Sequence, residues 1–510
     1  MRDWLPAGHL VWFVLDVVEE LDTSAFHRRH ANAGAGRAAF DPDMLLALLV
    51  YAYCRGVRSS RQIERLCEVD VAFRVICAAD VPDHSVIARF RQAHDKAFTS
   101  LFTQVLMLAA RAGLGRFGTI AIDGTKIAAN ASLAANRGEE WLREQVEVIV
   151  AEAERADAAE DAEYGPGRGD EVPDDLAEPA SRAARIRAAL AEIEAERRAA
   201  EQGSAERRAN ARKEMTAISG GDRGPGRRTA EVEVHAAQLR LRRLIAAQHE
   251  KIDAYAAAVV AAEAAKVRRP LGRPPVSIED SRDIRLARTA VLAAQARAEE
   301  YARRHAERAA SVAPARANIT DPASRIMPTR RGWIQGYNVQ VAATADQLIV
   351  ATSVGQNTAD ATAFVSMMTA AQQAAEACRQ ASGRADITIG TVLADAGYAS
   401  NDNLTAPGPD RLIALGKGRQ HHHDARTRPA TGDPPPQASP RQVMDHRLRT
   451  PQGAQLYKRR GATVEPAIGN LKKIIDRCNR RGLHAAAAEI DLAAAAFNLL
   501  KIHRSRPATS

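Results

Sequence analysis

The chain has 510 residues, of which 46% are hydrophobic and only 4% aromatic. Much of the apolar content is alanine, which favours helices and thin cores over a large sheet protein. The five cysteines form no Cys-x-x-Cys pair, which argues against a disulfide framework and a zinc site, and no apolar run reaches the roughly 18 residues of a membrane-spanning helix. The net charge of +9 fits either a bland basic surface or a polyanionic partner, with nucleic acid as the first candidate.

Residues 1–117 are predicted to form an all-α N-terminal domain. Apolar side chains in the segment 10–18 recur at helical spacing, and Asp41-Pro42 is typical of a helix start. Two further short helices are expected to begin near Ser59 and near Pro82.

The second of these short helices carries Arg89 and Arg91. Two short helices with a basic second member resemble a helix-turn-helix, which inserts its second helix into the major groove of DNA. A plain helical bundle with a solvated basic face explains the same pattern equally well.

A short apolar strand is predicted at 118–128, with Asp123 at its end and Gly124 next to it. Residues 118–135 are taken as the first part of a catalytic domain. The following residues, 136–317, are rich in Ala, Glu and Arg and lack clean heptads, so we expect a long insertion of weakly packed, partly mobile helices.

Residues 318–503 are predicted to complete the catalytic domain. Alternating apolar residues predict a hairpin, and Asp360 is expected to cap the helix that follows it rather than to serve as a fourth metal ligand. The polar, Pro-rich stretch 417–450 is predicted to be a loop or disordered linker. The predicted strands lie at 336–342, 348–354, 387–394 and 411–415, and the predicted helices at 360–379 and 451–503.

Three acidic residues stand in similar settings. Asp123 and Asp395 each end an apolar strand, and Glu465 is expected at or near the start of a helix rich in Lys and Arg. The order of strand, hairpin, helix, strand, helix, strand and helix that carries them is that of a ribonuclease H-like fold, a mixed sheet flanked by helices. Three clustered carboxylates repel one another unless divalent cations lie between them, and hard oxygen ligands select Mg²⁺ or Mn²⁺.

Basic residues surround these acidic positions. A polyanionic substrate would explain their number, and two ions about 3.5–4 Å apart would suit in-line phosphoryl displacement on it. The basic residues concerned are Lys126, Arg330, Arg331, Lys458, Arg459, Arg460, Lys472 and Lys473.

These motifs carry a resemblance to bacterial insertion-sequence DDE transposases. The segment 122–132 around Asp123 resembles the first acidic motif of that family, and 394–398 around Asp395 is similar to the second. Tyr457, Arg460 and Glu465 are similar to the Tyr…Arg…Glu signature around the third. Further similarity lies in residues 40–110, 320–325, 335–340, 480–483 and 497–499.

The resemblance implies a mechanism. Asp123, Asp395 and Glu465 would hold two Mg²⁺ (or Mn²⁺) ions that cut a DNA strand at the element end and then join the freed 3′-hydroxyl to target DNA. Tyr457 and Arg460 would contact backbone phosphate, as an alternative to a packing tyrosine and a solvated charge. The expected partner is double-stranded DNA, with a homo-oligomer on DNA, no membrane, and a cytoplasmic, nucleoid-associated bacterial setting.

Two other functions remain open from the residues. One keeps the fold but lacks strand transfer, as in a ribonuclease H-like DNA nuclease. The other is a non-catalytic DNA-binding architectural protein that uses the helical insertion. A run of three histidines before Asp424 has the composition of a metal site, but a Pro-rich linker provides no rigid scaffold for one.

Overall fold

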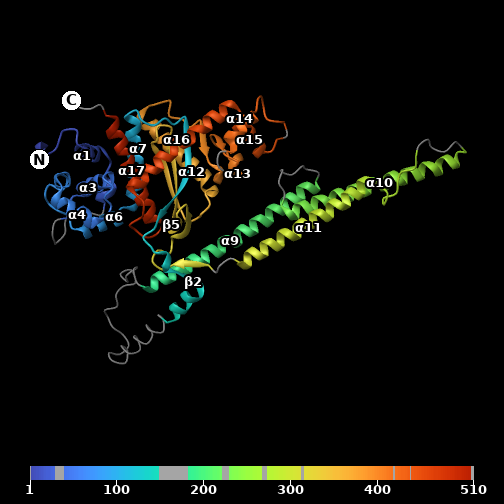
Figure 1. Ribbon diagram of the computed structural model, residues 1–510, viewed down its shortest axis with the longest axis horizontal. Helices are drawn as coiled ribbons and strands as arrows, with labels where there is room; N and C mark the ends of the chain where they lie inside the picture. The colour runs from blue at the N-terminus through green and yellow to red at the C-terminus, as the bar shows by residue number, and fades with distance from the viewer. Residues whose placement is uncertain are drawn as a thin grey trace. The chain divides into compact units, whose positions relative to one another are not determined.

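The computed structural model describes residues 2–28, 39–148, 182–220, 229–266, 273–311, 315–416, 420–436 and 438–506. The chain divides into two compact units, one made of Met1–Glu192 and Arg316–Ser510 and the other of Ile193–Ala315. The first unit contains the main sheet together with the N-terminal helices (Figure 1). One continuous core joins these helices to the sheet, so packing does not separate them at residue 117.

The N-terminal region is helical, as its apolar spacing predicts. Asp41 begins α3 by accepting a hydrogen bond from the Asp43 amide, and Pro42 occupies the first turn, where a missing N–H costs nothing. The helix-turn-helix pattern is interrupted, because a third short helix, α5, lies between α4 and α6. The helices are α1 (Leu10–Glu20), α2 (Ser24–His27), α3 (Pro42–Cys54), α4 (Ser60–Val69), α5 (Val71–Ile76), α6 (His84–Ala93) and α7 (Asp95–Arg111).

A six-stranded mixed sheet forms the centre of the first unit. Its order is β4-β5-β1-β7-β8, with β6 paired to β5. β1 runs parallel to β7 and antiparallel to β5, and β7 runs parallel to β8. The predicted hairpin is confirmed as β5 and β6, whereas β4 was not predicted. The strands are β1 (Thr119–Ala128), β4 (Arg325–Thr329), β5 (Gly332–Thr344), β6 (Ile349–Gly355), β7 (Thr391–Ala394) and β8 (Asp410–Ile413).

Helices flank this sheet. α16 contacts β1 and β5, whereas α12 and α17 contact β6 (Figure 1). Asn498 of α17 fixes that helix to β6, because its amide exchanges two hydrogen bonds with the backbone of Ile349. α17 is long and apolar enough to cross a membrane, but 78% of its apolar window is buried, as in a core helix. The helices are α12 (Phe364–Ser382), α13 (Asn401–Thr405), α14 (Gln420–Thr427), α15 (Pro440–Arg449), α16 (Pro451–Ile474) and α17 (Leu483–Ser505).

Two local predictions are wrong. The stretch 417–450 is not a loop throughout, because it contains α14 and α15. Glu465 does not lie at a helix start, because α16 begins at Pro451 and passes through Glu465-Pro466 without ending. Pro466 lacks the N–H that would bond the Ala462 carbonyl, and the side chain of Gln347 donates to that carbonyl instead, at 3.2 Å.

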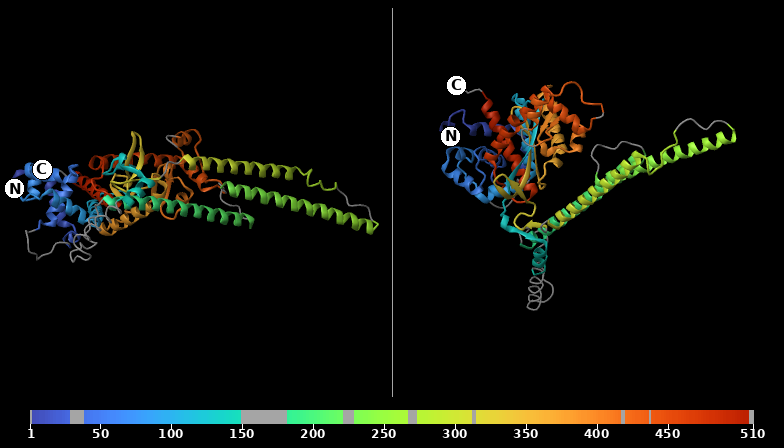
Figure 2. Two further views of the ribbon diagram at one scale, coloured as in Figure 1. Left: turned by 90° about the horizontal axis from the view of Figure 1, so that it is seen from below. Right: turned by 45° about the vertical axis from the view of Figure 1, so that its right-hand side comes forward.

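The inserted segment begins and ends at a short antiparallel ladder within the first unit. β2 (Asn136–Gly138) pairs with β3 (Arg316–Asn318), so the two ends of the insertion lie side by side. Between them run three long helices, as the composition predicts, and α10 packs along α11 (Figure 2). These helices are α9 (Arg182–Ser219), α10 (Ala230–Ala264) and α11 (Arg282–Ser311).

Candidate functional site

Two neighbouring parallel strands bring Asp123 and Asp395 to the same place. Ile122 pairs with Ala394, so the next residue on each strand is the acidic one. The apolar residues before them are fully buried and fix both strands in the core. Asp123 does not end its strand as predicted, because β1 continues to Ala128 while β7 stops.

Arg460 of α16 links the first and third acidic residues. Its Nη1 lies 2.9 Å from Asp123 Oδ2, and its Nη2 lies 3.3 Å from Glu465 Oε1. The side chains of Arg460 and Asp123 are only 17% and 20% exposed, whereas that of Glu465 is 63% exposed. One guanidinium therefore holds the two carboxylates near each other in a partly buried setting.

Burial and charge set the ionisation of this cluster. Burial raises the pKa of Asp123, and the negative charge of Asp395 acts in the same direction. Arg460 opposes both effects because its positive charge favours the carboxylate form. Asp395 accepts a hydrogen bond from the Gly397 amide at 2.8 Å, which orients its carboxylate.

The three acidic residues fit a cation in their chemistry. The carboxylates lie around a positively charged group, the Arg460 guanidinium, which stands where a cation would balance Asp123 and Glu465. Among the described residues, however, their oxygen atoms do not form a group in which every ligand atom lies within 4.8 Å of the others. Shared metal binding would require Arg460 to withdraw and the exposed Glu465 side chain to turn inward.

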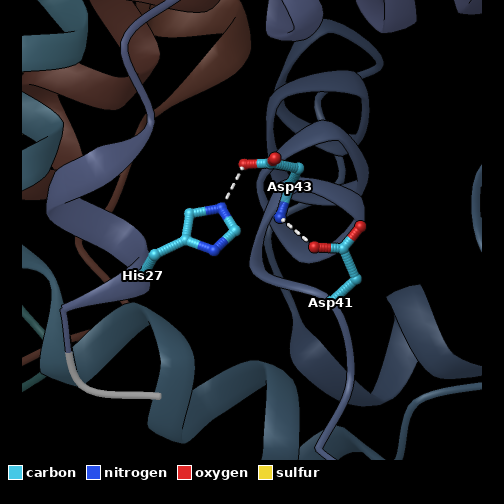
Figure 3. Close-up of side chains that lie close together, drawn as sticks. All are labelled: His27, Asp41 and Asp43. Atoms are coloured by element: carbon cyan, nitrogen blue, oxygen red, sulfur yellow. Dashed lines mark hydrogen bonds and ion pairs between the residues drawn. The ribbon is translucent and has the colours of Figure 1, made fainter. Parts of the chain in front are cut away.

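Two other groups do bring three ligand atoms that close, and both lie in the N-terminal helices. In the first, His27 Nε2 is 2.9 Å from Asp43 Oδ1, and Asp41 accepts from the Asp43 amide (Figure 3). Helix capping and an ion pair account for these contacts. The second group, Glu64, Asp83 and His84, has the same form, since Asp83 caps α6 and His84 pairs with Glu64.

Four of the basic residues predicted to bind DNA are solvent-exposed. Arg330 and Arg331 form the turn between β4 and β5, Arg89 lies on α6, and Lys472 lies in the last turn of α16. Trp333 beside the hairpin turn is 63% exposed, although large aromatic side chains are usually covered. Sequence reasoning missed Trp333, and its single signal was an aromatic residue directly after an Arg-Arg-Gly turn.

Three other predicted DNA contacts point into the protein. Arg91 is 6% exposed and donates to the Arg58 carbonyl and to Ser60 Oγ, so its donors serve packing. Lys126 Nζ donates to the Thr358 carbonyl at 3.1 Å and lies 3.3 Å from Asp360 Oδ1, with its side chain 16% exposed. These positions argue against a direct phosphate contact by either residue.

Tyr457 is the third residue of this kind. It is 5% exposed, and its hydroxyl donates to the Ala394 carbonyl at 3.2 Å, immediately before Asp395. Burial raises the pKa of Tyr457 to about 12. The contact supports the packing alternative and gives Tyr457 a part in holding the end of β7.

A buried acid outside the acidic cluster joins three of the sequence blocks. Asp321 accepts a hydrogen bond from Tyr337 at 2.6 Å and from the Gly482 amide at 3.0 Å. It is fully buried, and burial raises its pKa. These hydrogen bonds bring together three segments that carry the sequence similarity, namely 320–325, 335–340 and 480–483. A cavity of about 960 Å³, lined in part by Arg480 and Arg481, lies beside them.

Comparisons with known proteins address the two ends of the chain. Residues 1–93 match the family described as Transposase domain (DUF772), and residues 422–503 match the family described as Transposase DDE domain. Glu465 and Arg460 lie in the second matched region, whereas Asp123 and Asp395 lie in neither. The curated proteins and the solved structures gave no match.

Proposed function

We propose that this chain is a transposase of the insertion-sequence DDE type, which cuts DNA at the ends of its element and joins them to target DNA through Asp123, Asp395 and Glu465. The matches of residues 1–93 and 422–503 to two transposase domain families support the assignment. The observation that carries the proposal is the meeting of these residues. Asp123 and Asp395 follow paired residues of adjacent parallel strands, and Arg460 ties Asp123 to Glu465 of α16, the helix that contacts β1 and β5.

The element order supports a ribonuclease H-like catalytic domain. Along the chain, β1 carries Asp123, the β5–β6 hairpin and α12 follow, and β7 precedes Asp395. α13, β8 and α16 with Glu465 then complete the order that the acidic motifs predict. The domain is interrupted after β2 and resumes at β3, which accommodates the insertion.

Asp123, Asp395 and Glu465 would hold the Mg²⁺ or Mn²⁺ ions of the reaction. When bound, two such ions supply activation of the attacking oxygen and stabilisation of the leaving oxygen in phosphoryl transfer. The chain's own contribution is to hold the carboxylates on rigid strands and on a helix. Arg460 keeps Asp123 and Glu465 from repelling each other, and would move from this bridge toward DNA phosphate, which suits its planar guanidinium.

The exposed cations would contact the phosphate backbone of DNA. Arg89 and Lys472 lie at helix surfaces, and Arg330 with Arg331 forms a hairpin tip. Trp333 beside that tip offers an aromatic face for stacking on an unpaired base near the cut. Joining two element ends requires the ends to be held together, so we expect a homo-oligomer on DNA, acting in the cytoplasm.

A strand-transfer assay tests the proposal. Purified protein is mixed with a pre-cut element end, a target plasmid and Mg²⁺, and joined products are measured. Wild type should form joined products, whereas Asp123→Ala should lose cleavage and joining while keeping most of its DNA affinity.

The competing functions give other results in the same assay. Hydrolysis without joined products would indicate a nuclease that lacks strand transfer. DNA binding without cleavage or joining, unchanged in Asp123→Ala, would indicate the architectural DNA-binding protein and would overturn the assignment of the acidic residues.

A further inference from the structure

Asp360 does not use its side chain to cap a helix. It precedes the short 3₁₀ helix Ala361–Ala363 but makes no capping hydrogen bond there. Its Oδ1 instead accepts from Asn338 Nδ2 at 2.8 Å and from Gln340 Nε2 at 2.8 Å, and Lys126 Nζ lies 3.3 Å away. Three donors therefore converge on one carboxylate oxygen.

The register of the sheet brings these donors together. Gly124 pairs with Gln340 and Lys126 pairs with Asn338, so alternate residues of β1 and β5 face the same side. A Cβ at Gly124 would lie 2.5 Å from Asp360 Oδ1 and 2.7 Å from Gln340 Nε2. The glycine after Asp123 therefore leaves the space that Asp360 and Gln340 occupy.

The same network reaches the turn that carries Asp395. The Tyr398 hydroxyl donates to Gln340 Oε1, and Tyr398 is fully buried. Gln340 therefore has its amide nitrogen on Asp360 and its amide oxygen on Tyr398. Tyr398 is the last residue of the 3₁₀ turn that begins directly after Asp395, so the amide connects Asp360 to that turn.

The other oxygen of Asp360 faces Asp395. A Cβ at Gly397 would lie 3.6 Å from Asp360 Oδ2 and 3.0 Å from Asp395 Oδ1, so the two carboxylates flank one glycine. Within the described chain, Oδ2 has no hydrogen-bond partner. Asp360 Oδ1 thus accepts from three donors, whereas Asp360 Oδ2 lies on the side of Gly397 and Asp395.

We propose that Asp360 is a positioning residue of the catalytic site, which fixes the Asp395 turn through Gln340 and Tyr398 and holds Lys126 in its inward position. The inference rests on the proposed function, because it assigns Asp360 a role toward the cation site of Asp123, Asp395 and Glu465. A merely structural role would affect stability and leave cation binding unchanged.

The test measures Mn²⁺ binding to the folded full-length chain without DNA, by electron paramagnetic resonance of free Mn²⁺. Asp360→Ala should weaken Mn²⁺ binding about tenfold, since supporting residues commonly change metal affinity by about 10–100-fold. Asp360→Asn keeps an acceptor oxygen and should lie between Asp360→Ala and wild type. Asp402→Asn is the matched control, because Asp402 is an exposed acid in the first turn of α13 and should bind like wild type.

Gly124→Ala provides a second variant that keeps the Asp360 carboxylate. Its methyl group would displace Asp360 and Gln340, so it should weaken Mn²⁺ binding in the same direction as Asp360→Ala. If Asp360→Ala does not fold, Gly124→Ala still tests whether the position of Asp360 affects Mn²⁺ binding. In cleavage assays, Asp360→Asn should require more Mg²⁺ for half-maximal rate with unchanged DNA affinity.

Asp395→Asn separates failure of this inference from failure of the proposed function. If Asp395→Asn loses Mn²⁺ binding while folded Asp360→Ala and Gly124→Ala bind as tightly as wild type, the role of Asp360 is refuted and the site stands. If Asp395→Asn also binds like wild type, the proposed cation site itself is wrong.

Discussion

Arg460 carries a charge that both stabilises Asp123 and competes with a cation for it. Asp123 is mostly buried, so its carboxylate form depends on nearby positive charge. In the absence of an ion, the guanidinium provides that charge from 2.9 Å. In the proposed reaction, Mg²⁺ or Mn²⁺ ions would take over this charge from Arg460.

Replacement of Arg460 should change the pH dependence of cleavage. Burial already raises the pKa of Asp123, and loss of the opposing positive charge raises it further. The proposed reaction would need ionised Asp123, so the acid limb of the rate profile should move to higher pH in Arg460→Gln. Arg460→Lys keeps the charge and should shift less. Identical acid limbs for wild type and Arg460→Gln would contradict this role.

The hairpin arginines should act on DNA affinity rather than on chemistry. Arg330→Ala and Arg331→Ala each remove an exposed cation, so DNA affinity should fall and the slope of log affinity against log salt should decrease by about one per lost phosphate contact. Arg379→Ala is a suitable control, because Arg379 is exposed but paired with Glu376 on α12. Equal salt slopes for all three variants would exclude the hairpin from the DNA contact.

At the scale of whole elements, α17 is fixed to the sheet and to α7 by a buried acid. Asp491 of α17 accepts hydrogen bonds from Thr99 of α7 and Thr352 of β6. Burial raises its pKa above the ordinary value. The folded state therefore binds this proton more tightly than the unfolded state does.

Asp491→Asn should make stability less dependent on pH. For wild type, the contribution of this group is greatest below the unfolded pKa and is lost as pH rises through the folded pKa. Asparagine cannot ionise, so it does not lose stability in this way, and the stability of Asp491→Asn relative to wild type should increase from pH 4 to pH 7. Denaturant unfolding at several pH values measures the trend. A relative stability that falls with pH would contradict it.

Local patterns of the sequence were sufficient to predict β1, which contains Asp123, and β7, which Asp395 follows. A continuous apolar run and a nearby glycine are short-range signals, and they predicted strands that bring Asp123 and Asp395 into the sheet. The strand register and the parallel pairing of β1 with β7, which bring the two acids together, depend on residues more than 260 positions apart.

α16 shows why other features could not be predicted. The sequence predicts Glu465 at or near a helix start, and Pro466 beside it is normally a sign of a helix start or break. The helix continues because Gln347, from the β5–β6 turn, satisfies the carbonyl that Pro466 leaves free. The inward position of Lys126 also depends on contacts that are distant in sequence, since its partners Thr358 and Asp360 lie more than 230 residues away.

At the scale of the whole molecule, the two ends of the insertion lie side by side in the β2–β3 ladder. Asn136 pairs directly with Asn318, so a short connection can replace the residues between the two strands. The insertion thus resembles a domain inserted between adjacent ends, which folded proteins tolerate.

A chain in which a Gly-rich turn replaces residues 140–314 should therefore fold. The deletion removes Ile186 and Ala189 of α9, which are buried in the full chain, and uncovers the apolar surface against which they pack. A loss of about 1–3 kcal/mol in unfolding free energy is therefore expected. Circular dichroism should show one cooperative thermal transition at a lower temperature. An unfolded product would show that the insertion is required for the catalytic unit to fold.

The most direct measurement of the central claim is a crystal structure with Mn²⁺ and its anomalous scattering. We expect Mn²⁺ density between Asp123, Asp395 and Glu465, with Arg460 withdrawn from its bridge and the Glu465 side chain turned toward the ion. Density confined to other groups, such as His27 with Asp41 and Asp43, while Arg460 still bridges Asp123 and Glu465 would contradict the claim.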